Sequence, residues 1–116
     1  MGELIKEPLE QFGLSLTAQN TKRSLFSKIG VVGCGKEGRN IVSLTASAGL
    51  DVVFMEESDE RIEYVMEKLS DGLTTKVENW GLTQAEKRGI MNRIKPTLSY
   101  EDFKGCDFVV EYSRYS

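Results

Sequence analysis

The sequence predicts an α/β fold with a parallel sheet and a pair of helices inserted after the second strand. Two short apolar runs, Ile29-Gly30-Val31-Val32 and Val52-Val53-Phe54-Met55, show no polar alternation. Such runs are typical of strands buried on both faces of a parallel sheet. A helical stretch lies between the two runs, and a much longer amphipathic stretch follows the second. This order favours parallel strands joined by helical crossovers.

The first strand, helix and second strand together extend from Lys28 to Met55. Gly49 stands where a left-handed C-cap is expected at the end of the helix. The helical spacing places Ile41, Leu44 and Ala48 on one face, with Val42 and Ala46 beside them.

The inserted helices are predicted between residues 58 and 93. The first runs from about Ser58 to Asn79, with Ser58 as its N-cap and acidic residues in its first turn. Thr83-Gln84-Ala85-Glu86 has the form of a capping box, so the second helix should run from Gln84 to about Arg93. Apolar residues of the first helix recur every three or four positions and predict one buried stripe. They are Ile62, Val65, Leu69, Leu73, Val77 and Trp80.

The remaining elements are short. Pro96 is expected to end the second inserted helix, and a strand is expected near Thr97-Leu98. A turn at residues 101–105 then leads to a strand at Phe108-Val109-Val110. We expect residues 28–116 to form one domain, incomplete at its C-terminal end, and residues 1–27 to form an arm or linker.

Composition excludes several classes of function. The chain has 116 residues, a net charge of −3 and 15 basic residues that are spread along it. A nucleic-acid or anionic-membrane surface would need clustered Lys and Arg, so neither partner is expected. No apolar run could span a bilayer, no secretory signal is visible, and two cysteines fit reduced thiols, so we expect a cytoplasmic protein.

The segment Gly33-Cys34-Gly35-Lys36-Glu37-Gly38 has the glycine spacing of a dinucleotide-binding loop. It leaves a buried strand and opens a helix, as that loop must. Gly33 permits the tight turn, Gly35 lets the backbone approach a pyrophosphate, and Gly38 lets helix and strand pack closely. The helix N-terminus would present free N–H groups to the phosphates, so the fold expected is a truncated Rossmann-type sheet.

Glu56 ends the second strand, where a carboxylate accepts hydrogen bonds from the adenosine ribose hydroxyls. That carboxylate would repel the extra phosphate of NADP, so the expected cofactor is NAD. The competing interpretation is that Glu56 or Glu57 is a solvated residue at a strand end.

Two residues between the glycines leave alternatives open. Glu37 opposes a pyrophosphate electrostatically, unless Lys36 offsets its charge or Glu37 points to solvent. Cys34 is interpreted as a small residue that fills the variable position of the loop. A redox role is the alternative, because helix N-termini lower the pKa of thiols.

These residues, taken together, resemble the N-terminal domain of the 3-hydroxyacyl-CoA dehydrogenases, including the bacterial 3-hydroxybutyryl-CoA dehydrogenases. The resemblance covers Lys28 to Glu111 and rests on KIGVVGCGKEGRNI, AGLDVVFMEESDERIE, LTQAEKRGIMNRIKPTLSYEDF and GCDFVVE. The glycine loop alone would fit dozens of families. The inserted helical pair followed by a Thr-containing strand and CDFVVE is far more specific.

The resemblance implies an enzyme of fatty acid metabolism that oxidises the 3-hydroxyl of an acyl-CoA and passes hydride to NAD. It implies that Gly33, Gly35 and Gly38 hold the pyrophosphate, with Cys34, Lys36 and Glu37 in the same loop. Glu56 would hold the ribose, and Glu111, followed by Tyr112, would lie near the nicotinamide side. Lys68 and Lys76 are candidates for the phosphates of CoA, with solvated lysines as the more ordinary interpretation.

The sequence departs from the family at Glu37, Asn40 and Tyr112-Ser113, where Met, a small residue and Ala-Val are usual. It also contains no histidine, whereas the general base of the family is a histidine oriented by a glutamate. We therefore expect a fragment or isolated cofactor domain that is inactive alone. The alternatives are a stand-alone nucleotide-sensing domain and a degenerate, non-binding paralogue. If the chain ends at Ser116, its last strand borders the sheet, and we expect self-association through that strand or partial disorder beyond Val110.

Overall fold

The computed structural model describes residues 27–112, which form a four-stranded parallel sheet with helices packed on it. The expected arm at residues 1–27 lies outside the described residues except for Ser27. The elements are β1 (Lys28–Val32), α2 (Lys36–Ser47), β2 (Asp51–Met55), α3 (Asp59–Asn79), α4 (Gln84–Asn92), β3 (Ile94–Thr97), the 3₁₀ helix η1 (Tyr100–Phe103) and β4 (Phe108–Glu111). The predicted α/β class, the parallel sheet and the inserted helical pair are confirmed.

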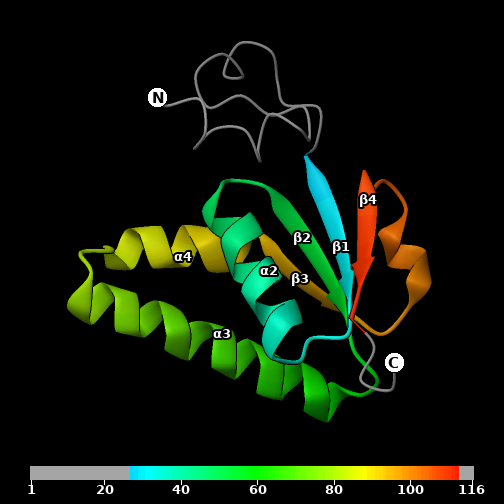
Figure 1. The fold of residues 1–116 in the computed structure, drawn as a ribbon, viewed down its shortest axis with the longest axis horizontal. Helices are drawn as coiled ribbons and strands as arrows, with labels where there is room; N and C mark the ends of the chain where they lie inside the picture. Colours follow the sequence, from blue (N-terminus) through cyan, green and yellow to red (C-terminus); the bar gives the residue numbers. More distant parts are fainter. Residues whose placement is uncertain (1–26, 113–116) are drawn as a thin grey trace.

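The strand order is β3-β2-β1-β4, and every neighbouring pair is parallel. Lys28 is level with Asp51 of β2, and Ile29 is level with Phe108 of β4. The register brings the carboxyl ends of β1, β2 and β4 to one edge of the sheet (Figure 1). Ligands of open parallel sheets bind at this edge.

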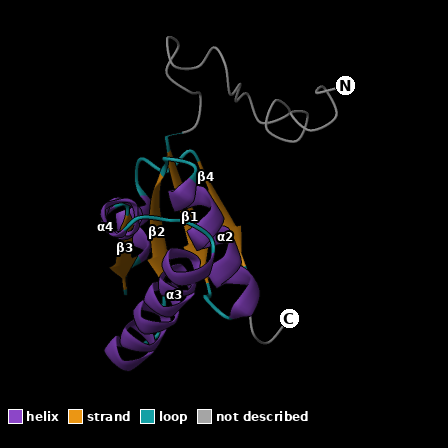
Figure 2. Cartoon of the chain, turned by 90° about the vertical axis from the view of Figure 1, so that its left-hand side faces the viewer, coloured by secondary structure: helices purple, strands orange, loops and turns teal. Residues whose placement is uncertain are grey.

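One face of the sheet holds the core, because side chains alternate between the two faces along each strand. Val31, Val52 and Phe54 are buried on that face with residues of α2, α3 and α4. Helix α2 packs on β1 and β2. In Figure 1 it lies in front of the sheet, and α3 and α4 extend together away from the sheet. Figure 2 shows these helices from the side. The other face bears Gly30, where an added Cβ would lie 3.1 Å from the Phe103 ring of η1.

Helix boundaries follow their capping residues. Ser58 Oγ accepts a hydrogen bond from the Arg61 N–H, and Thr83 and Glu86 form the predicted capping box. Gly49, after α2, has φ +98°, as expected of a left-handed C-cap.

Two sequence expectations about side chains are wrong. Val42 and Ala46 form the buried face of α2, whereas Leu44 is 64% exposed, so the helix is rotated from the expected face. The buried stripe of α3 consists of Val65, Leu69 and Leu73, and Trp80 is 78% exposed. Trp80 follows the far end of α3, and this end extends beyond the sheet and α2 in Figure 1.

Pro96 does not end α4. The helix ends at Asn92, and Pro96 lies inside β3, which begins before the expected strand near Thr97-Leu98. Proline is tolerated there because β3 is a border strand, where a backbone N–H facing outward has no partner to lose.

Candidate cofactor site

The candidate site lies where β1, β2 and β4 end. Gly33 follows β1, Glu56 follows β2 and Tyr112 follows β4. The Tyr112 N–H donates to the Val32 carbonyl at 2.7 Å, and the Gly33 N–H donates to the Met55 carbonyl at 3.1 Å. These backbone contacts fix the glycine loop against both neighbouring strands.

The three glycines of the loop have different surroundings. A Cβ on Gly33 would lie 1.9 Å from the Tyr112 carbonyl oxygen, and the residue has φ +86°. A Cβ on Gly38 would lie 2.2 Å from the Gly33 carbonyl oxygen. Around Gly35 no atom lies within 4 Å of an added Cβ. Gly33 and Gly38 are therefore required by packing, whereas Gly35 keeps its side of the loop open.

The N-terminus of α2 begins at Gly35, which offers no side-chain cap. The first N–H groups of a helix have no intrahelical acceptors, and they point along the axis out of the helix. At this end of α2 they face the open side of the loop. Main-chain donors and the positive end of the helix dipole suit a bound phosphate.

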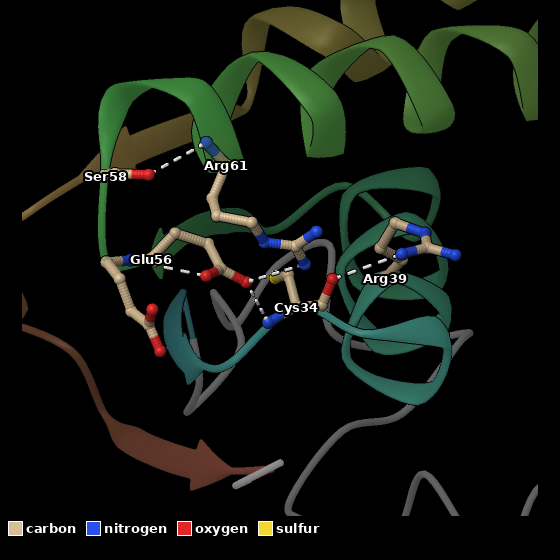
Figure 3. Close-up of polar contacts among 6 residues, drawn as sticks. Cys34, Arg39, Glu56, Ser58 and Arg61 are labelled. Carbon is tan, nitrogen blue, oxygen red and sulfur yellow. Dashed lines mark hydrogen bonds and ion pairs between the residues drawn. The ribbon is translucent and has the colours of Figure 1, made fainter.

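Glu56 is 7% exposed, and its carboxylate is held from several directions (Figure 3). Oε2 accepts a hydrogen bond from the Cys34 N–H at 2.8 Å and lies 3.5 Å from Arg61 Nη2. Oε1 accepts from the Glu57 N–H at 3.3 Å. The interpretation as a solvated strand end fits Glu57, which is exposed, and does not describe Glu56.

Cys34 is fully buried, and its thiol is not activated. The pKa of Cys34 is raised to about 12, chiefly by burial and next by the neighbouring Glu56 carboxylate, while Arg39 and Arg61 act in the opposite direction. The raised pKa favours the protonated thiol at neutral pH and so speaks against the redox alternative, because the thiolate is the reactive form. Cys34 is a small buried residue between two glycines.

The remaining loop residues face solvent. Lys36 and Glu37 are both exposed, in the first turn of α2. A carboxylate there is favourable to the helix dipole even though it opposes a pyrophosphate. Glu111 is exposed at the end of β4, level with Val32 of β1. Tyr112 is half-buried and packs against the core.

A cluster that the sequence did not predict lies beside Glu56. The guanidinium of Arg61 is 4.9 Å from the centre of the Tyr64 ring, that of Arg39 is 5.7 Å away and the Lys68 ammonium is 5.4 Å away. Arg39 Nη1 also donates to the Cys34 carbonyl at 3.3 Å. One signal was available: a cation at Arg61, three residues after the N-cap, opposes the helix dipole and so indicates another partner.

The structure does not bring Lys68 and Lys76 to one point. Lys68 lies by Tyr64, whereas Lys76 lines a hollow of about 560 Å³ between the end of α2, α3 and α4. Leu73, Leu82 and Ile90 form its apolar wall. The hollow lies at the carboxyl end of α2, remote from the glycine loop, so we assign it no part in dinucleotide binding. Both lysines are exposed, as the interpretation as solvated residues requires.

Two other features are absent from residues 27–112. No group of His, Cys, Asp and Glu there could hold a metal ion. None of the described helices has the length and apolar character needed to cross a bilayer.

Residues 28–113 match the model of the 3-hydroxyacyl-CoA dehydrogenase NAD-binding domain. A 3-hydroxybutyryl-CoA dehydrogenase of Bradyrhizobium diazoefficiens is 31% identical over 88 residues, which are 76% of this chain and 30% of the relative. A fatty acid oxidation complex subunit alpha of Acinetobacter baylyi is 35% identical over 81 residues, or 70% of this chain and 11% of the relative. The chain thus spans at most about a third of these relatives.

Solved structures agree with this match. The (S)-3-hydroxybutyryl-CoA dehydrogenase of Ralstonia eutropha superposes with a TM-score of 0.75 at 31% identity. The superposition covers 78% of this chain and 32% of the Ralstonia chain.

Proposed function

The chain belongs to the 3-hydroxyacyl-CoA dehydrogenase family as an NAD-binding domain, and we propose that it is the cofactor part of an enzyme that interconverts 3-hydroxyacyl-CoA and 3-ketoacyl-CoA. The single observation that supports this most strongly is the loop around Gly35. It is open to a ligand on one side, while Gly33 and Gly38 are closed by packing on the other.

The proposed roles follow the geometry of the site. The N–H groups at the start of α2 receive the pyrophosphate, and the open side of Gly35 lets it approach. Glu56 accepts hydrogen bonds from the adenosine ribose, and Glu111 and Tyr112 lie on the nicotinamide side. Bound NAD supplies the acceptor for hydride from C3 of the substrate.

The proton of the 3-hydroxyl needs a base whose pKa is near neutrality. The chain has no histidine, so we propose that a part of the enzyme outside this chain supplies the base. The chain alone should then bind NAD without oxidising a 3-hydroxyacyl-CoA. Steady consumption of NADH by the purified chain with a 3-ketoacyl-CoA would contradict this division of roles. The two free cysteines support a further proposal, that the protein is cytoplasmic.

Calorimetric titration of the full chain with NADH and NADPH tests cofactor binding. Wild type should bind NADH saturably and more tightly than NADPH, because the Glu56 carboxylate repels a 2′-phosphate. Glu56→Arg should lose or reverse that preference. Glu78→Arg makes the same charge change at the exposed far end of α3 and should keep it. No binding of either nucleotide by a folded chain would support the non-binding paralogue instead.

We also propose that the chain self-associates through β4. This strand forms one border of the sheet, and Val109 is 44% exposed. An apolar border strand offers its backbone groups to a second copy. Sedimentation should show a dimer for wild type and a shift toward monomer for Val109→Lys. A single monomer peak for wild type, with strongly protected amides at Val109 and Val110, would contradict the proposal.

A further inference from the structure

The Glu56 carboxylate has two oxygens in unequal environments. Oε2 is engaged by the Cys34 N–H at 2.8 Å and by Arg61 Nη2 at 3.5 Å, whereas within residues 27–112 Oε1 accepts only from the Glu57 N–H, at 3.3 Å. An ionised carboxylate oxygen can accept about two hydrogen bonds. Oε2 is therefore saturated and Oε1 retains capacity. A carboxylate fixed by one oxygen presents the other in a defined direction.

Arg61 is itself held in place, although the ion pair with Glu56 is long. Its guanidinium lies 4.9 Å from the centre of the Tyr64 ring, one turn along α3, and the face of an aromatic ring attracts a cation. The Arg61 side chain is 27% exposed, and that of Glu56 only 4%. Figure 3 shows the Arg61 side chain reaching from α3 across Glu56 toward Cys34. The arginine thus joins α3 to the glycine loop through a single carboxylate.

The Nε of Arg61 is in an unfavourable environment. This atom is buried and has no hydrogen-bond partner among the described residues. A buried donor without an acceptor is unfavourable, and such groups are uncommon in folded proteins. Packing alone would favour an apolar side chain at this position. The presence of an arginine here, at that cost, indicates a role for its charged end.

We propose that Arg61 is a positioning residue for cofactor selection: it fixes Oε2 of Glu56 so that Oε1 meets the 2′-hydroxyl of the adenosine ribose. The Tyr64 ring holds the Arg61 guanidinium, and the Cys34 N–H is the second donor to Oε2. This inference rests on the proposed function, because it assumes that NAD occupies the loop. It goes further by naming the residues that orient the carboxylate.

The test compares NADH with the analogue whose adenosine ribose lacks the 2′-hydroxyl, by calorimetry on the full chain. Wild type should bind NADH about tenfold more tightly than the deoxy analogue, which is typical of one hydrogen bond to a charged acceptor. Arg61→Met keeps the length of the side chain and removes its charge. In this variant the ratio should fall to about twofold or less, mainly through weaker NADH binding. A purely structural role would weaken both ligands equally and leave the ratio unchanged.

Two more variants complete the design. Tyr64→Leu should lower the ratio in the same direction but less, because Arg61 keeps its charge and loses only its support. Arg88→Met is the matched control, since it removes the same charge from an exposed position on α4 and should keep the wild-type ratio. A wild-type ratio in Arg61→Met overturns the inference alone. Absence of NADH binding by the folded wild-type chain overturns the proposed function and the inference with it.

Discussion

The glycine loop and the cluster around Glu56 meet at the same edge of the sheet, but the first is built from main chain and the second from side chains. Contacts of the loop run between backbone atoms of Gly33, Gly38 and Tyr112. The cluster depends on Arg61 and Tyr64, which come from another helix. A backbone contact tolerates no added atom, whereas a side-chain contact can be weakened in steps. Substitutions in the loop should therefore lower the stability of the fold, whereas substitutions in the cluster should change the choice of cofactor.

The largest effect is expected at Gly33. In Gly33→Ala the new Cβ would overlap the Tyr112 carbonyl oxygen, and the residue would keep a left-handed φ. Strain and overpacking together should lower the free energy of unfolding by about 3 kcal/mol or more. Urea denaturation followed by circular dichroism measures this.

Gly35→Ala is the matched control, because its Cβ meets nothing. Its free energy of unfolding should change by less than about 1 kcal/mol, while NADH affinity falls as the methyl group enters the open side of the loop. Equal destabilisation of Gly33→Ala and Gly35→Ala would contradict the distinction between a glycine required by packing and one that keeps the loop open to a ligand.

The next effect on stability is expected at Cys34, which lies between Gly33 and Gly35, and it appears only at alkaline pH. The pKa of Cys34 is raised to about 12 by burial, from 9.0. The unfolded chain therefore loses this proton before the folded one does. Stability is kept below pH 9 and falls as the pH rises toward 12, by at most about 1.4 kcal/mol per pH unit. Unfolding midpoints measured between pH 8 and about pH 10.5 report the slope.

Cys34→Ala provides the reference for that slope, because Lys and Tyr residues also titrate at alkaline pH. The variant should lose stability less steeply than wild type over the same range. Parallel slopes for the two proteins would mean that Cys34 is not protected from ionisation as its burial implies.

The smallest effect is expected at the start of α3, which carries the side-chain half of the site. Ser58→Ala removes the acceptor of the Arg61 N–H and should lower the free energy of unfolding by about 1 kcal/mol. Thr75→Ala removes a hydroxyl that donates within the exposed part of α3 and should change it by less than about 0.5 kcal/mol. Thermal unfolding of both variants would sharpen the comparison, and a neutral Ser58→Ala would contradict the capping role.

The backbone half of the site could be predicted because glycine spacing reports backbone geometry directly. Gly33, Gly38 and Gly49 each lie where a Cβ clash or a positive φ requires glycine. The caps at Ser58 and Thr83 were predictable for the same reason, since they are local contacts. Local chemistry thus determined the order and the ends of most elements.

The side-chain half could not be predicted, because its members meet only through tertiary packing. Arg39 and Tyr64 belong to different helices, and no spacing in the sequence relates them. The exposed positions of Leu44 and Trp80 escaped prediction in the same way. Apolar periodicity indicates which residues could be buried, but the length of the opposing surface decides which of them are. The prediction that Pro96 ends a helix is wrong because a proline is tolerated within a strand at the border of a sheet, and the sequence does not show that β3 is such a strand.

That border has a consequence for how copies of this domain could assemble. The carbonyls of Arg93 and Thr97 accept from Val52 and Glu56 of β2, so Pro96 sits between them and turns its backbone nitrogen outward. A strand added beside β3 would face a position with no donor, whereas β4 has no proline. Pro96 therefore disfavours extension of the sheet beyond β3. Pairing of β4 with its own copy would be two-fold symmetric and would stop at two subunits instead of growing into a fibre.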